Sequence, residues 1–409
     1  MEIEDLEQLR VVLETRTTLW GLRLQGLDLT GPEGAALLQR RCAGLVVLGG
    51  LLTVDLEHHL RVSGATIFPA DPAAPVDPYR ARLYTPAELY AGLLERGYAT
   101  TPDATAYAWS REASLANDAF VTLLRSIHDH SMTDALNELL GGRGVVGVMG
   151  GHAVQRGTQE YADAALLGMA IAASGRVVLT GGGPGAMEAG NLGGICRTEA
   201  ELEAALTDLA AVPSFRPSID DWARSAWQVR ERVAGDRLAT TPADVTSVGV
   251  PTWFYGHEPP NLFASLIAKF FSNALREDLL INRCTDGIVV LPGAAGTVQE
   301  IFQAVTPLYY APDDVRLPPL VLVGREQWTR TVPVWPALEA LAAGRRMAGA
   351  VHLVDTTAEA ADLLARAEAA YLDIRPNDCH DDLTEEQEEL WDELDEAWWP
   401  VGEEDRKSV

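Results

Sequence analysis

One short segment combines a loop of small residues with an acidic side chain one helical turn further on. The apolar run 287–291 predicts a buried strand, residues 292–296 a tight loop, and Thr297 the start of a helix. Backbone N–H groups and the positive end of the helix dipole at such a junction bind anions, phosphate above all. Glu300 follows one turn later, and a carboxylate beside a phosphate cradle indicates chemistry on a phosphorylated molecule. We expect the phosphate to contact Gly293, Ala294, Ala295, Gly296 and Thr297.

Two further glycine-containing loops follow apolar runs upstream. Gly150 and Gly151 come after the run 145–149, and the loop 181–187 (Gly-Gly-Gly-Pro-Gly-Ala-Met) comes after the run 176–180. Three such loops at the ends of neighbouring strands favour a ligand of nucleotide size. The first strand is not followed by the dinucleotide fingerprint, and no lysine-containing phosphate loop occurs, so dehydrogenase and nucleoside triphosphatase functions are disfavoured.

Charged residues near these loops are candidates for chemistry. Arg276 can hold a phosphate or a ribose, or pair with Glu300, because its planar fork binds oxygens in a fixed geometry; the alternative is a surface arginine that caps a helix. His257 and Glu258 follow the third predicted strand, and either can act as an acid, a base or a contact to the base edge. Glu258 can instead cap a helix that begins near Asn261.

The order of predicted elements indicates the fold class. The alternation of strand and helix continues along the chain. A helix is predicted over 159–173, a third strand over 247–254, a helix from about 261 to 277, and further strands at 320–323 and 351–354. This alternation predicts an α/β fold with a doubly wound, parallel sheet.

The chain divides into three predicted parts. Residues 1–105 form an N-terminal α/β lobe, with strands at 45–48 and 65–68 and no catalytic motif; 106–375 form the nucleotide-binding domain; and 376–409 form an acidic tail with the spacing of an amphipathic helix. A helix over 110–140 carries His128 and His130. Two positions apart on a helix, these histidines point to different faces, so a metal site is disfavoured.

Composition narrows the function further. The net charge of −27 opposes nucleic-acid binding. Lysine occurs only as Lys269 and Lys407, which limits Schiff-base chemistry. No apolar run is long enough to span a bilayer, the acidic N-terminus does not resemble a signal peptide, and the four cysteines have no metal-binding spacing. We expect a cytoplasmic protein without a membrane partner, a metal ion or a cofactor.

Two of the motifs resemble those of a known family. Residues 181–188 are similar to the GGGxxGxM motif and residues 292–300 to the PGGxGTxxE motif of the LOG ("lonely guy") phosphoribohydrolases, often mislabelled lysine decarboxylases; the resemblance covers roughly residues 140–370. With its N-terminal lobe, the chain most resembles the larger bacterial nucleoside 5′-monophosphate nucleosidases. Ala294 replaces a motif glycine, and Glu277 stands where the family often has lysine.

The resemblance implies a Rossmann-like homodimer or larger homo-oligomer that hydrolyses a nucleoside 5′-monophosphate to free base and ribose 5-phosphate. Glu300 and Arg276 are then the catalytic residues, with Glu300 stabilising an oxocarbenium-like state or orienting water. The base and ribose are expected to contact Gly150, Gly151, Gly182, Gly183, Gly185, Met187, His257 and Glu258. The alternative is a protein that binds or senses a nucleotide without turnover; DNA binding fits the charge poorly.

Overall fold

The computed structural model describes residues 2–69, 71, 73–235, 241–255 and 258–372. Residues Met1–Ala367 form one compact unit and Glu368–Val409 a second. The predicted acidic tail, with Cys379, therefore lies outside the described residues, as does His257.

The described part of the larger domain contains a seven-stranded sheet in the order β11-β10-β9-β5-β6-β7-β8, and every neighbouring pair in it is parallel. Its strands are β5 (Val145–Met149), β6 (Val177–Thr180), β7 (Ser247–Gly249), β8 (Leu266–Ile267), β9 (Gly287–Val290), β10 (Leu320–Val323) and β11 (Val351–Val354). The chain adds β6, β7 and β8 on one side of β5 and then β9, β10 and β11 on the other. The predicted doubly wound parallel sheet is confirmed, and its winding reverses between β5 and β9.

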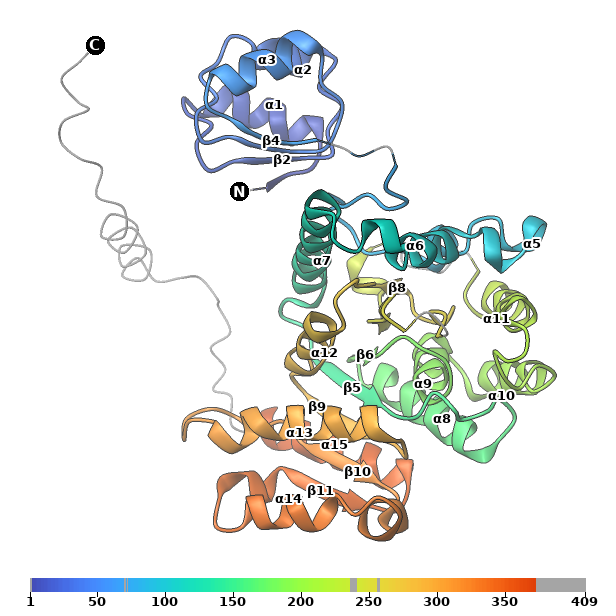
Figure 1. The fold of residues 1–409 in the computed structure, drawn as a ribbon. Coiled ribbons are helices and arrows are strands. Elements are labelled where there is room, and N and C mark those ends of the chain that lie inside the picture. The colour runs from blue at the N-terminus through green and yellow to red at the C-terminus, as the bar shows by residue number, and fades with distance from the viewer. Residues whose placement is uncertain (1, 70, 72, 236–240, 256–257, 373–409) are drawn as a thin grey trace. The chain divides into compact units, whose positions relative to one another are not determined.

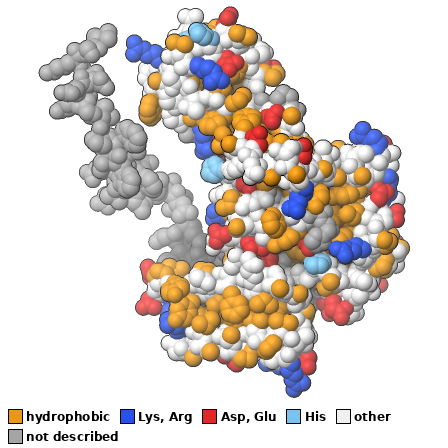
Figure 2. Space-filling view, viewed as in Figure 1, with side chains coloured by type: hydrophobic (Ala, Val, Ile, Leu, Met, Phe, Trp, Pro, Cys, Tyr) orange, Lys and Arg blue, Asp and Glu red, His pale blue; other side chains and the backbone are white. Residues whose placement is uncertain are grey.

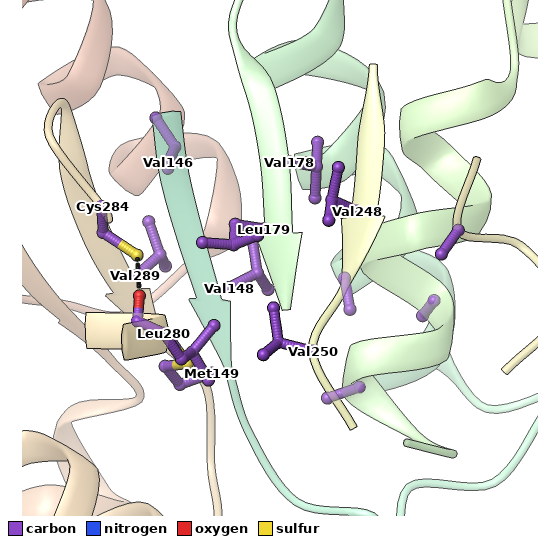
Figure 3. Packing of buried hydrophobic residues seen from close by; sticks show 14 of the residues in the cluster. Val146, Val148, Met149, Val178, Leu179, Val248, Val250, Leu280, Cys284 and Val289 are labelled. Carbon is purple, nitrogen blue, oxygen red and sulfur yellow. Dashed lines mark hydrogen bonds between the residues drawn. The ribbon is translucent and has the colours of Figure 1, made fainter. Parts of the chain in front are cut away.

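The central strands are fully buried and largely apolar because helices cover both faces of the sheet. Side chains of β5, β6, β7 and β9 pack together with α12, as Figure 3 shows for Val148, Leu179 and Val289. The buried thiol of Cys284 belongs to the same packing and donates to the carbonyl of Leu280 at 3.1 Å. Burial raises the pKa of this thiol far above its usual range, so Cys284 is a packing residue and not a nucleophile.

The helices of this domain are α4 (Pro86–Leu89), α5 (Leu93–Arg96), α6 (Pro102–Ser110), α7 (Ala119–Leu140), α8 (Gln159–Ala173), α9 (Ala186–Ile195), α10 (Glu199–Leu209), α11 (Ile219–Val233), α12 (Asn273–Asn282), α13 (Ala295–Tyr310), α14 (Trp335–Ala342) and α15 (Thr357–Leu372) (Figure 1). The predicted helix over 110–140 begins only at Ala119, where the Asp118 side chain caps it.

The prediction for residues 247–277 was partly wrong. Strand β7 ends at Gly249, and the expected helix from 261 is instead a buried extended segment that includes β8. Ile267 in this segment exchanges backbone hydrogen bonds with Tyr84, which holds the chain extended. Helix α12 starts at Asn273, after Ser272, whose side chain caps it. Pairing with a distant part of the chain overrides the local helical preference of the apolar residues.

The N-terminal lobe contains a second, four-stranded parallel sheet in the order β1-β2-β3-β4, with its own apolar core. Its elements are β1 (Glu2–Ile3), α1 (Leu6–Thr15), β2 (Arg23–Gln25), α2 (Pro32–Leu37), β3 (Val46–Leu48), α3 (Val54–Val62) and β4 (Thr66–Phe68). The predicted strands at 45–48 and 65–68 correspond to β3 and β4, whereas the two- and three-residue strands β1 and β2 were not predicted.

Exposed hydrophobic side chains lie along the surface over α13, which Figure 2 shows as an apolar band. Phe302 and Tyr310 are 38% and 77% exposed on this helix. No helix among the described residues is both long enough and apolar enough to cross a membrane.

Candidate functional site

A cavity of about 720 Å³ opens at the carboxyl ends of β5 and β9, where the winding of the sheet reverses. Ligands of doubly wound proteins bind in a crevice of this kind, because the connecting loops diverge to either side of the sheet. The cavity is lined by Gly150, Gly151, His152, Ala153, Val154, Gln155, Thr158, Glu160, Met187, Tyr255, Glu258, Arg276, Glu277, Pro292, Gly293, Ala294, Gly296, Thr297 and Glu300.

The loop after β9 and the start of α13 form one wall of the cavity. Helix α13 begins at Ala295, and its N-cap residue, Ala294, has no side chain that can accept a hydrogen bond from the first turn. The first-turn N–H groups are thereby left for an anion in the cavity. Four of the five residues expected to contact the phosphate line the cavity; Ala295 is not among its lining residues.

Gly293 is required by the packing of this loop. A Cβ atom there would lie 2.2 Å from the Oγ1 atom of Thr297, which is buried at 6% exposure. Only glycine allows the loop to fold back onto the first turn of α13.

Arg276 and Glu300 face each other across the cavity floor. The Nη1 atom of Arg276 lies 3.9 Å from Oε1 of Glu300. Two backbone hydrogen bonds fix the guanidinium: its Nε donates to the carbonyl of Val250 at 2.7 Å, and its Nη2 donates to the carbonyl of Gly181 at 3.3 Å. Arg276 is 8% exposed and is no surface cap, so of the two alternatives the structure shows the buried arginine beside Glu300.

Glu300 has an unusual charge environment. Burial raises the pKa of its carboxyl to about 7, Arg276 counteracts this, and the negative charges of Glu277 and Glu258 add to it. Glu277 is held by amide donors: Asn273 Nδ2 at 2.7 Å and Gln299 Nε2 at 2.6 Å. A carboxyl that changes its charge near neutral pH is suited to transfer protons.

The glycine-rich turn 181–187 supports the cavity more than it lines it. Gly182, Gly183 and Gly185 are buried and absent from the cavity lining, whereas Met187 reaches it. Gly182 has a φ of +70°, and its carbonyl accepts a hydrogen bond from the backbone of Asn261 at 2.7 Å. The motif residue Glu188 pairs with the buried Arg156 beneath α9, with Nε and Oε2 3.1 Å apart.

His152 is one of several lining residues that were not predicted from the sequence; the others include Gln155, Thr158, Glu160 and Tyr255. Its Nδ1 lies 3.2 Å from Oε1 of Glu258, which was predicted to line the site. Glu258 is described and lines the cavity, while its neighbour His257 lies outside the described residues. The position of His152 directly after Gly150 and Gly151, at the end of a buried strand, was a signal available in the sequence.

The remaining candidates are separate from this site. His128 is fully buried and bonds to the hydroxyl of Tyr84 at 2.8 Å, whereas His130 is 64% exposed, so the two do not form a metal site together. Lys269 is buried in an ion pair with Asp103. Among the described residues, the only acidic or metal-ligating cluster that is compact enough for an ion joins Glu2, Glu4 and Glu138, away from the cavity.

Comparisons with known proteins complete the description. Neither a protein-family model nor a curated protein sequence matches this chain. Similar solved structures include the molybdenum cofactor binding protein of the phototrophic bacterium Rippkaea orientalis (15% identity, TM-score 0.34, covering 55% of this chain and 98% of that one). Another is the molybdenum cofactor carrier protein of Chlamydomonas reinhardtii (18% identity, TM-score 0.33, covering 56% and 99%). Each match spans about half of this chain and nearly all of the other.

Proposed function

We propose that this protein hydrolyses the N-glycosidic bond of a nucleoside 5′-monophosphate, releasing the free base and ribose 5-phosphate. The proposal rests on one observation. Arg276 and Glu300 lie 3.9 Å apart, and they line the same cavity as the start of α13, which has no side-chain cap. An anion site and a buried carboxylate in one cavity can hold a phosphate and act on the sugar attached to it.

The phosphate binds at the start of α13 in this proposal. The N–H groups of the first turn and the Thr297 hydroxyl act as donors, and Arg276 supplies the balancing positive charge. The loop is rigid because Thr297 packs directly against Gly293. Binding energy from the phosphate then positions the ribose, although the phosphate itself does not react.

Glu300 acts on the ribose. As the base departs, C1′ acquires positive charge, and an ionised carboxylate nearby stabilises this oxocarbenium-like state. The same carboxylate can take a proton from the attacking water. Only ionised Glu300 serves either purpose, and its pKa of about 7 makes this ionisation depend on neutral or higher pH.

The second candidate function is nucleotide binding without turnover. It is favoured by the four carboxylates that line the cavity beside one guanidinium, those of Glu160, Glu258, Glu277 and Glu300. In that case Glu300 binds a ribose hydroxyl, and the resting state is a stable complex.

Incubation of the purified chain with AMP, GMP, CMP, UMP and IMP tests the two functions. Free base and ribose 5-phosphate are measured by chromatography, and nucleotide binding by calorimetry. Glu300→Gln is expected to lower kcat about 10²- to 10⁴-fold. Glu326→Gln is the matched control, because Glu326 is exposed and pairs with Arg330 at the surface.

The outcomes separate the candidates. Base release that is lost in Glu300→Gln and kept in Glu326→Gln supports hydrolysis. Tight binding with no release supports the sensor, and full activity of Glu300→Gln removes this residue from the mechanism.

We also infer from the LOG resemblance that the chain forms a homo-oligomer. The exposed Phe302 and Tyr310 on α13 are apolar side chains that association could cover. Light scattering on the purified chain tests this directly: a mass of one chain contradicts it.

A further inference from the structure

We propose that His152, oriented by Glu258, is the acid that protonates the departing base. The inference rests on the proposed glycosidic hydrolysis and adds a catalytic residue that neither motif contains. Glu300 acts on the sugar side of the scissile bond, and the base side needs a proton donor of its own, because a nucleobase anion is a poor leaving group.

The pairing of His152 with Glu258 has the geometry of an oriented imidazole. Nδ1 of the ring lies 3.2 Å from Oε1 of the carboxylate. A carboxylate at one ring nitrogen fixes the orientation of the ring and leaves the opposite nitrogen, Nε2, to deliver a proton. The two residues come from loops after different strands, β5 and β7, and both line the cavity.

The backbone of His152 is held firmly at the centre of the site. The N–H of Gly151 donates to the carbonyl of Pro292 at 3.1 Å, which ties this loop to the phosphate loop. The carbonyl of Gly151 accepts from Ala186 at 3.2 Å. A Cβ atom at Gly185 would lie 2.8 Å from the carbonyl oxygen of His152, so the start of α9 packs closely against it.

His152 also lies where two cavities meet. The segment 152–155 lines the large cavity and, on its other side, a smaller one of about 220 Å³. The smaller cavity is lined by the buried Phe215 and by the exposed Arg216, whose guanidinium lies over the Phe215 ring at 5.6 Å; a nucleobase can stack on the plane of a guanidinium. The imidazole thus lies between the cavity that holds Glu300 and a place suited to a base.

The bond between C1′ and the base nitrogen breaks, its electron pair stays with the base, and the proton from Nε2 of His152 goes to a base nitrogen. Water forms the new bond to C1′ and gives its proton to the Glu300 carboxylate. Exchange with solvent returns a proton from Glu300 to His152, so that one water is consumed in each turnover.

The test compares two leaving groups. One substrate is the most rapidly hydrolysed nucleotide, and the other is p-nitrophenyl β-ribofuranoside 5-phosphate, whose nitrophenolate departs without a proton. His152→Ala is expected to slow nucleotide hydrolysis about 10²-fold or more and to leave nitrophenolate release nearly unchanged. Glu258→Gln is expected to lower kcat for the nucleotide about tenfold, with KM unchanged, because it is a positioning residue.

His130→Ala is the matched control. His130 also pairs with a carboxylate, Asp134, at 3.3 Å, and its side chain is 64% exposed against 50% for His152, but it lies on α7 and outside the cavity. Thermal unfolding of each variant shows whether the fold is kept.

Equal losses on both substrates in His152→Ala would overturn the acid role while leaving the proposed function intact. Full nucleotide hydrolysis by that variant would overturn it as well. If the wild-type chain hydrolyses neither substrate, the proposed function itself fails, and this inference with it.

Discussion

Both sheets of this molecule consist of parallel strands, but the two sheets differ in strand order. In the N-terminal lobe the strands lie in chain order, β1-β2-β3-β4, so every connection winds in the same direction. In the larger domain the order reverses between β5 and β9. Loops at a reversal leave in opposite directions and open a crevice, whereas loops in a sheet wound one way stay in contact. The candidate site lies in the sheet whose winding reverses.

Glycine-containing turns occur at the strand ends of both sheets, so the turns alone do not make a site. In the N-terminal lobe, a Cβ atom at Gly50 would lie 2.2 Å from the carbonyl oxygen of Leu27, and one at Gly49 would lie 2.5 Å from the ring of Tyr79. Neighbouring chain fills the space beside these turns. At Gly293 a Cβ atom would likewise meet neighbouring chain, 2.2 Å from Thr297 Oγ1, but the loop also lines a cavity that Arg276 and Glu300 share. Tight turns serve packing in both sheets, and only in the larger one do they also border a cavity.

Among substitutions that add a single methyl group, we expect the largest effect on activity in the sheet whose winding reverses. Gly293→Ala places a Cβ atom 2.2 Å from Thr297 Oγ1, so the phosphate loop must move. We expect kcat/KM for the nucleotide to fall about 10²-fold, the loss that follows a displacement of about 1 Å in a positioning group. Steady-state kinetics measures this, and unchanged kinetics would contradict the placement of the phosphate at this loop.

The same substitution in the N-terminal lobe should act on stability instead. Gly50 has a φ of +76°, and its Cβ atom would meet backbone, so Gly50→Ala is expected to destabilise the fold by about 1–3 kcal/mol. Thermal unfolding measures the loss, and kcat/KM per folded molecule is expected to stay at the wild-type value. A changed KM without a change in unfolding would show that the N-terminal lobe takes part in the site.

A smaller effect is expected in the pH dependence. Burial raises the pKa of Glu300 to about 7, and the ionised form is the active one, so kcat/KM should fall about tenfold per unit below about pH 7. Glu277→Gln removes a neighbouring negative charge, which lowers the pKa of Glu300 and shifts this acid limb to lower pH. Glu326→Gln, at the surface, should leave the limb in place. A shift to higher pH in Glu277→Gln would contradict the assignment of the limb to Glu300.

The sequence alone was sufficient for the strands that are almost entirely apolar. The strands β5, β6, β9 and β10 are fully buried, and burial demands apolar residues whatever the neighbours are. Strand β11 is buried only at Val351, but three of its four residues are apolar. The turn between β9 and α13 was also predictable, because a strand, a turn of small residues and a helix start are local features. The two-residue strands β1 and β8 carry too few residues for a pattern, and β2 has a polar residue at each end, Arg23 and Gln25. All three form through pairing with other strands.

The tertiary structure decided which charged groups meet. Arg276 lies beside Glu300 because α12 begins at Asn273, and this start depends on the extended segment that Tyr84 holds from a distant part of the chain. His152 lies beside Glu258 because β5 and β7 end at the same edge of the sheet. Local sequence sets which residues form strands and turns, since burial and backbone conformation act within a few residues. The distances between side chains from separate loops, and the pKa shifts that follow from them, exist only after the sheet has brought those loops together.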